Sequence, residues 1–148
     1  MKPENLQSVN ESIKAFLNYK RMAVGGVSRN KKKYGNIVFK KLLKYGYQVF
    51  PVNKNTDEIE GYKCYRSIED LPQNIDALVL VTPPEQSLEL IKQAKGLGIK
   101  NFWLQEGAEN QEIIDFGKAN ELNIITGHCI MVQLKRMKNL DGKHQLNG

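Results

Sequence analysis

Cysteine and histidine are scarce in this chain, which has two of each. Cys64 and Cys129 lie far apart and have neither the spacing of a zinc site nor the pattern of a disulfide framework, so we expect no metal ligands. No apolar run approaches the roughly 20 residues that a membrane helix needs, and the N-terminal stretch has no apolar signal core. We therefore expect a cytoplasmic protein without a membrane partner.

Acidic residues are missing from one long stretch. Between Arg29 and Lys44 there are seven basic residues and no acidic residue, against a net charge of +6 for the whole chain. The sequence has no recognition motif typical of nucleic-acid binders, so we expect no nucleic-acid partner and favour a small polyanion near this stretch. Instead of binding a polyanion, Lys40, Lys41 and Lys44 could simply form the solvent-exposed face of a helix.

The remaining composition is ordinary. A hydrophobic fraction of 41% and a charged fraction of 26% are typical of a globular domain, and a chain of this length fits one core. We expect a leading amphipathic helix in residues 1–20, a domain in 21–131, and a basic tail in 132–148 that is partly helical or disordered.

Apolar runs alternate with helical patterns along the chain. A leading helix is expected over 6–17, strands over 22–27, 47–52, 77–81, 102–104 and 124–126, a short strand at Cys64–Tyr65, one helical turn after Ser67, and helices over 36–45, from the prolines to Gly96, and over 111–120. This alternation predicts an α/β fold, an open parallel β-sheet with helices on both faces in a single domain. Trp103 is expected in the core.

A glycine turn follows the first expected strand. Backbone amides at Gly26, Val27 and Ser28 are natural phosphate ligands if a helix opens there. Ser28 stands where the dinucleotide fingerprint has a second glycine, and no third glycine follows. Ser28 could alternatively cap the helix.

The second strand ends in Asn53 and Lys54, where NAD enzymes usually have a carboxylate for the ribose hydroxyls. A nearby cation suits a phosphorylated ribose, which both NADP and coenzyme A carry. Polar or glycine-rich segments at other strand ends, Thr82–Pro84, 105–107 and 127–129, lie where such folds bind ligands. The two prolines could alternatively serve as a strand stop and helix start.

Several motifs occur together in a fixed order: VGGVS at 24–28 with Lys32 to Asn36, YQVFPVN at 47–53, Ile59, Gly61 and Tyr65, VTPPE at 81–85, 98–108 with Trp103, and Gly127 with 129–131. On these motifs the sequence resembles the CoA-binding-domain proteins. These are small stand-alone relatives of the N-terminal domain of the succinyl-CoA synthetase alpha subunit and of NDP-forming acyl-CoA synthetases. The resemblance implies a Rossmann-like domain that binds coenzyme A.

The resemblance also implies roles for individual residues. The turn at Gly26, Val27 and Ser28 would hold pyrophosphate, with Lys33, Gly35 and Asn36 near phosphate and Asn53 and Lys54 near the phosphorylated ribose. Val81, Thr82, Pro83 and Pro84 would face adenine or the start of pantetheine, and Gln105 and Gly107 would complete the cofactor-binding set. Relatives commonly have proline at positions 31 and 54 and a basic residue at 128, whereas this chain has Lys31, Lys54 and His128; Gly25 replaces an apolar strand residue.

No catalytic constellation can be named. The related synthetases use a histidine in a further domain, so we expect a coenzyme A or acyl-CoA binding protein without its own catalytic domain, acting as carrier, sensor or partner subunit. One alternative is an NADP-binding oxidoreductase-like protein, and another is a thiol-redox module that forms a CoA mixed disulfide at Cys129. Adjacent residues on an extended chain face opposite ways, so His128 is badly placed to activate Cys129, and we favour a buried structural cysteine.

Overall fold

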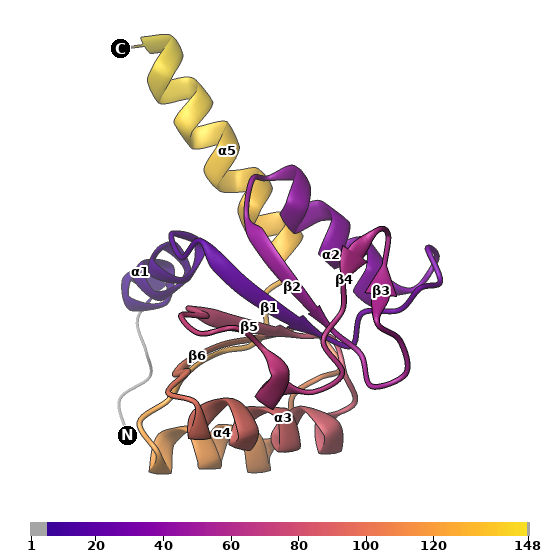
Figure 1. Cartoon of the computed structure of the whole chain (residues 1–148). Helices are drawn as coiled ribbons and strands as arrows, with labels where there is room; N and C mark the ends of the chain where they lie inside the picture. Colours follow the sequence, from indigo (N-terminus) through magenta and orange to yellow (C-terminus); the bar gives the residue numbers. More distant parts are fainter. Residues whose placement is uncertain (1–5, 148) are drawn as a thin grey trace.

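A computed structural model describes residues 6–147 of the chain (Figure 1). Five parallel strands form one sheet in the order β2-β1-β5-β6-β7, and a separate hairpin pairs β3 with β4. The helices are α1 (Leu6–Leu17), α2 (Tyr34–Lys44), α3 (Pro84–Gly96), α4 (Gln111–Ala119) and α5 (Ile130–Asn147), with one 3-10 turn, η1 (Ile68–Asp70). The strands are β1 (Arg21–Gly25), β2 (Gln48–Val52), β3 (Glu58–Ile59), β4 (Tyr62–Lys63), β5 (Ala77–Leu80), β6 (Asn101–Leu104) and β7 (Asn123–Ile125).

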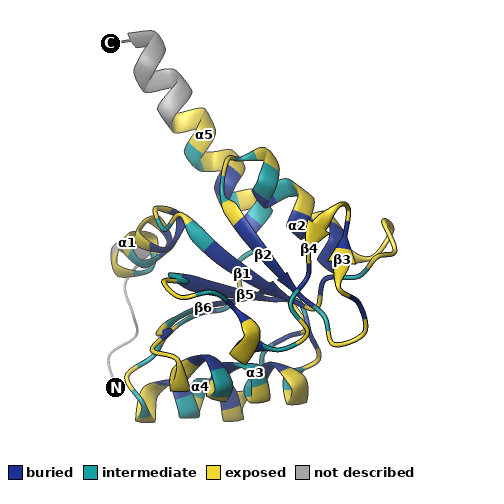
Figure 2. Ribbon diagram, in the orientation of Figure 1, coloured by how far each residue is buried: buried dark blue, intermediate teal, exposed yellow. Residues whose placement is uncertain are grey.

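Helices cover both faces of the sheet. On one face α1, α2 and α5 pack over Met22, Val24, Val79 and Trp103, and on the other α3 and α4 pack over alternate strand residues such as Leu78. Figure 2 shows the strands as the most continuously buried part of the molecule. Burial on both sides explains why these strands are apolar at successive positions rather than alternating. The predicted α/β class, a Rossmann-like parallel sheet in one small domain, is therefore confirmed.

Trp103 lies fully buried in the core, as expected, with its ring 5.2 Å from that of Phe16 in α1. Its indole Nε1 donates to the His128 carbonyl oxygen at 2.9 Å. The aromatic residue thus joins β6 to the segment between β7 and α5.

The expected strand at Cys64–Tyr65 is wrong. β4 ends at Lys63, and Tyr65 forms a single parallel bridge with Val52. The chain turns tightly at Glu60 and Gly61 and pairs Ile59 with Tyr62. Backbone hydrogen bonds join Cys64 to Asp57 and Tyr65 to Pro51 and Asn53, but they produce only the single bridge. The single helical turn expected after Ser67 is present as η1, with the Ser67 hydroxyl donating to the Asp70 carboxylate at 3.0 Å.

The last helix, α5, continues to Asn147 and projects away from the sheet (Figure 1). Its first half packs on the core through Ile130 and Leu134. Within the described residues, no helix has both the length and the apolar character needed to cross a membrane.

Candidate functional site

The candidate site lies at the carboxyl end of β1. This strand pairs with β2 on one side and with β5 on the other, so the chain leaves neighbouring strands in opposite directions and opens a crevice there. Gly26 follows β1 with a φ of +91°, and a Cβ at this position would lie 2.8 Å from the Val81 carbonyl oxygen. A larger residue would therefore strain the backbone and push β1 and β5 apart.

The first turn of α2 lies directly against this glycine turn. Gly35 is buried, and a Cβ on it would collide with the Gly26 carbonyl oxygen. Because Gly35 has no side chain, the first turn of α2 can pack directly against the turn at Gly26. Among the hydrogen bonds of residues 6–147, none uses the backbone N–H of Tyr34 or Gly35, and such free amides at a helix N-terminus favour an anion.

Two asparagine amides hold the carbonyl groups of the turn. Asn53 Nδ2 donates to the Val27 oxygen and Asn36 Nδ2 to the Ser28 oxygen, each at 2.7 Å. The carbonyl and the N–H of a trans peptide point in opposite directions, and no described peptide is cis. The N–H groups of Ser28 and Arg29 consequently point away from these amides, as in an anion-binding backbone nest.

Both asparagines were assigned to ligand contact from the sequence, and in the structure their amide nitrogens are occupied by the turn itself. Asn53 Oδ1 also accepts from the Asn55 N–H at 2.8 Å. Asn36 Oδ1 is buried and has no hydrogen-bond partner among the described residues, which leaves one polar atom beside the turn to be satisfied.

Ser28 is not a helix cap. Lys33 occupies the N-cap position of α2, and its side chain makes no capping hydrogen bond. Ser28 Oγ instead accepts from the Asn30 N–H at 3.0 Å, which stabilises the loop between the turn and α2. Arg29 and Lys31 to Lys33 are exposed around this loop, so the charge is available to a ligand.

The segment after β5 borders the same turn. A Cβ on Gly26 would meet Thr82 Cγ2 at 3.0 Å, and the buried Thr82 hydroxyl lies 2.8 Å from that of Ser87. Pro83 is the N-cap residue of α3 and Pro84 is its first residue. The prolines therefore begin the helix, as the alternative interpretation proposed, while they also lie beside the crevice.

Gln105 connects the end of β6 to two other loops. Its buried side chain donates to the Tyr34 hydroxyl at 2.6 Å and accepts from the Ile130 N–H at 2.8 Å. It therefore reaches the glycine turn indirectly, through the first residue of α2. Gly107 has a φ of +92°, and no described contact links it to the turn.

Cys129 is partly exposed, so the expectation of a buried structural cysteine is wrong. β7 ends at Ile125, and the four residues before α5 carry the chain to the surface. Cys129 Sγ lies 3.4 Å from the Tyr34 hydroxyl and 3.6 Å from Gln105 Nε2. This cluster was missed from the sequence because Tyr34 and Cys129 are 95 residues apart.

The pKa values in this cluster follow from its contacts. Burial alone would raise the pKa of Cys129, but hydrogen bonds from Tyr34, Gln105 and the N–H groups of Val132 and Met131 outweigh it and lower that pKa. Burial and the Cys129 contact raise the pKa of Tyr34 to about 12. Tyr34 therefore stays protonated and can donate to a Cys129 thiolate.

The end of β2 has an additional cation that the sequence analysis did not identify. Arg66 donates to the Lys54 carbonyl oxygen at 3.3 Å and pairs with Asp57 at 2.6 Å, and the Arg66 hydrogen bond lowers the pKa of Asp57. The Lys54 side chain is exposed. No described contact ties the Lys54 ammonium to the turn.

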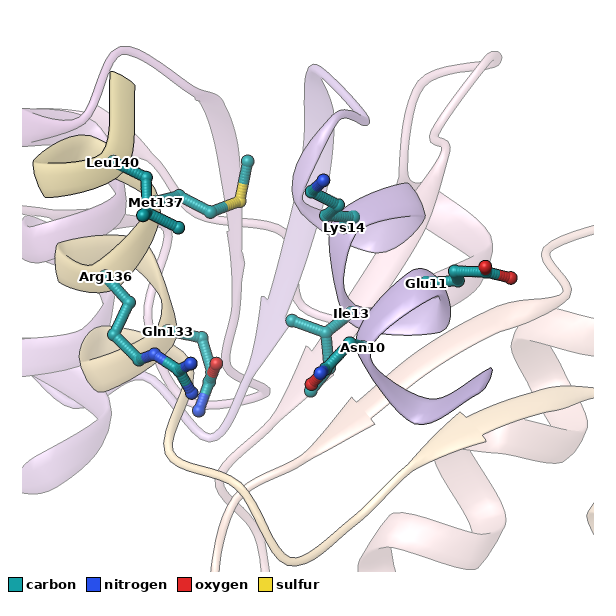
Figure 3. A pocket seen from close by; sticks show the side chains of 8 residues that line it. All are labelled: Asn10, Glu11, Ile13, Lys14, Gln133, Arg136, Met137 and Leu140. Carbon is teal, nitrogen blue, oxygen red and sulfur yellow. The ribbon is translucent and has the colours of Figure 1, made fainter. Parts of the chain in front are cut away.

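A groove of about 660 Å³ lies elsewhere, between α1 and α5 (Figure 3). Ile13, Met137 and Leu140 supply its apolar lining, and its charged lining consists of Glu11, Lys14 and Arg136. It contains none of the site residues predicted from the sequence. Within the described residues, no group of three or more His, Cys, Asp or Glu side chains could hold a metal ion.

Comparison with known proteins gives a consistent result. A family model described as "CoA binding domain" matches residues 20–135. The alpha subunit of ADP-forming acetate–CoA ligase II from Pyrococcus furiosus is 29% identical over 126 residues, which cover 78% of this chain and 28% of that protein. The uncharacterized protein YneT of Bacillus subtilis is 29% identical over 113 residues, covering 76% of this chain and 84% of YneT.

Several solved structures of small proteins match over nearly their whole length. A conserved hypothetical protein from Pyrococcus furiosus is 46% identical with a TM-score of 0.75, covering 78% of this chain and 99% of that one. A hypothetical protein from Pyrococcus horikoshii is 30% identical with a TM-score of 0.81, covering 92% and 97%. The chain thus spans about a quarter or less of the ligases that it matches first, and most of the small proteins.

Proposed function

The chain belongs to the CoA-binding domain family, and we propose that it binds coenzyme A or an acyl-CoA at the carboxyl end of β1 without catalysing a reaction of its own. In this role it acts as a carrier, a sensor or a partner subunit in the cytoplasm. One observation carries the proposal: the Asn53 and Asn36 amides hold the Val27 and Ser28 carbonyls, respectively, so that the following N–H groups point away from both amides.

The residues of the turn fit a pyrophosphate. Gly26 and Gly35 let the turn, the start of α2 and the segment after β5 come close together, and the unpartnered N–H groups at the start of α2 favour negative charge. Arg29, Lys32 and Lys33 add exposed positive charge beside them. When bound, coenzyme A would supply a thiol for acyl transfer, and the residues of this chain would bind and orient it.

The third phosphate of coenzyme A is assigned to the end of β2. Asn53 stands where NAD enzymes usually have a carboxylate, and Lys54 and Arg66 place two cations near this strand end. Val81, Thr82, Pro83 and Pro84 would then face adenine or the start of pantetheine across the crevice, and Gln105 and Gly107 would lie further along the ligand.

Isothermal titration calorimetry tests the proposal. We expect coenzyme A to bind, dephospho-CoA to bind more weakly, and both affinities to fall as salt is added because the ligand is a polyanion. Lys54→Ala should reduce the difference between the two ligands, whereas Lys95→Ala, in α3, should leave it unchanged. An absence of binding at millimolar coenzyme A would overturn the proposal.

A thiol-exchange role is a second candidate, favoured by the partly exposed Cys129 with its lowered pKa. The Cys129 thiolate would attack one sulfur of CoA disulfide, the sulfur–sulfur bond of that molecule would break, and one CoA thiolate would leave. The product is a mixed disulfide at Cys129, and no further oxidant is needed. Intact mass after incubation with CoA disulfide should reveal the adduct, which Cys129→Ser should abolish; an unmodified wild-type protein would exclude this role.

An NADP-binding role is the remaining alternative, motivated by the same missing carboxylate at Asn53. It has no hydride-transfer site that can be named among the described residues. Titration with NADPH, followed by its fluorescence, separates the two ligands. We expect no NADPH binding at concentrations where coenzyme A saturates the protein, and tighter binding of NADPH than of coenzyme A would favour the alternative.

A further inference from the structure

The β3–β4 hairpin places one carboxylate against the basic stretch between Arg29 and Lys44. Its turn consists of Glu60 and Gly61, with φ values of 53° and 80°, the positive pair found in tight two-residue hairpins. Asparagine and aspartate tolerate this conformation better than glutamate.

The Glu60 carboxylate lies close to basic side chains. Its Oε1 is 3.1 Å from Lys40 Nζ. The hydrogen bond from Lys40 holds the pKa of Glu60 below its usual range despite partial burial, and the charge of Lys31 and a hydrogen bond from Asn36 act in the same direction. Glu60 is therefore ionised at neutral pH and faces two of the seven cations in the stretch.

The hairpin is held over α2, so this carboxylate has a defined position. Ile59 is 1% exposed in the core. The Tyr62 ring packs edge-on against Phe39 of α2, with ring centroids 5.7 Å apart and planes at 85°. Figure 1 shows β3 and β4 beside this helix. These contacts on both sides of the turn keep Glu60 beside Lys40 of α2.

Asn36 connects this carboxylate to the candidate site. Its amide donates to the Ser28 oxygen at 2.7 Å, and Asn36 also helps to lower the pKa of Glu60. The negative charge is therefore one side chain away from the glycine turn. Without the Glu60 carboxylate, exposed positive charge would continue from the glycine turn through Lys31 to Lys40.

We propose that Glu60 is a specificity-determining residue that restricts the site to compact anions. A ligand whose phosphates do not extend along Lys31 and Lys40 avoids the carboxylate, whereas an extended polyanion lying along these lysines meets a like charge. Repulsion of the wrong ligand is a common source of specificity. For coenzyme A, the inference rests on the proposed function. The exclusion of extended polyanions does not depend on that function.

The test compares coenzyme A with long-chain inorganic polyphosphate on the full chain. Glu60→Gln keeps a hydrogen-bond acceptor and removes the charge, and Glu60→Asn does so with a residue that suits the positive φ. Glu58→Gln is the matched control, because it removes the same charge from an exposed position of the same hairpin. Circular dichroism checks that each variant is folded.

At low salt, both Glu60 variants should bind polyphosphate about tenfold more tightly than the wild type, since several phosphates gain from losing a nearby like charge. Coenzyme A should gain less than about threefold, and Glu58→Gln should change either affinity by less than about threefold. The gain for polyphosphate should shrink as salt is added.

Equal effects of Glu60→Gln and Glu58→Gln on polyphosphate would overturn the proposal, because net charge alone would then explain them. An equal gain for coenzyme A and polyphosphate would also overturn it, since Glu60 would set affinity and not selectivity. If the wild type fails to bind coenzyme A while the Glu60 variants still gain polyphosphate affinity over Glu58→Gln, the proposed function fails and the exclusion of polyanions stands.

Discussion

Asn53 Nδ2 donates to the Val27 carbonyl oxygen at 2.7 Å, and this bond ties the end of β2 to the turn that follows β1. The bond orients the peptide between Val27 and Ser28, so that its N–H points away from the Asn53 amide. In the proposed function, Asn53 would therefore act on the ligand through the backbone of a neighbouring segment, as a positioning residue.

Asn53→Ala should weaken coenzyme A binding about fivefold to tenfold, because one hydrogen bond of about 1 kcal/mol is lost and the turn is no longer held. Calorimetry measures the change. Asn101→Ala is the control, since Asn101 makes a similar amide-to-carbonyl bond with Asp76 at the opposite edge of the sheet. Equal losses of affinity in both variants would argue against the positioning role.

Gly35→Ala should destabilise the protein by more than about 2 kcal/mol, because the added methyl group overpacks a site that is filled by backbone. The collision is with the Gly26 carbonyl oxygen, so α2 or the turn must move. Urea unfolding measures the loss. Gly96→Ala, where a Cβ would meet no atom within 4 Å, should be neutral or stabilising by up to about 1 kcal/mol.

Cys129 should react with iodoacetamide at a lower pH than an ordinary thiol, because its lowered pKa yields more thiolate. Tyr34→Phe removes one hydrogen bond to that thiolate and should shift the rate profile to higher pH. Mass spectrometry follows the labelling. Cys64 is 3% exposed and burial raises its pKa, so Cys129→Ala should remain unlabelled at neutral pH; faster labelling of Cys64 would contradict this assignment.

Tyr47 should make stability depend on alkaline pH. Its hydroxyl donates to the Leu17 carbonyl oxygen, and burial raises its pKa to about 12. The folded-state pKa lies above the unfolded value of about 10, so the stabilisation is complete below about pH 10 and is lost as the pH rises toward 12.

Tyr47→Phe should therefore lower the free energy of unfolding by about 1 kcal/mol at pH 8 and reduce its decline between pH 10 and 12. The decline does not vanish, because the pKa of Tyr34 is also raised to about 12. Urea unfolding at several pH values provides the measurement. Tyr62→Phe, at an exposed ring, is the control. An equal loss of unfolding free energy in both variants would refute the role of Tyr47 burial.

The fold could be predicted from the sequence because burial dictates local composition. Ala77 to Leu80 is apolar at every position since both faces of β5 are covered, and Gly46 and Gly98 mark chain reversals with positive φ. Cys64–Tyr65 was misassigned because Tyr65 meets β2 at a single bridge only, and apolar spacing does not encode which residues pair.

The site could be predicted only in part. Gly26 and Gly35 indicate a close backbone approach, and the structure brings them together. The orientation of the Asn36 and Asn53 amides depends on loops that meet after the sheet forms, and the Tyr34–Cys129 contact joins residues 95 positions apart. Side-chain direction across such separations leaves no periodic signal in the sequence.

The strand order has a consequence for folding. β1 is completed by β5, and the Asp76 carboxylate that receives the Arg21 N–H lies 55 residues further along the chain. A pairing so distant in sequence has a large loop-closure entropy cost and forms slowly. The turn after β1 and the segment around Thr82 face each other only once β5 has joined, so a ligand held between them would slow unfolding and leave the rate of refolding nearly unchanged.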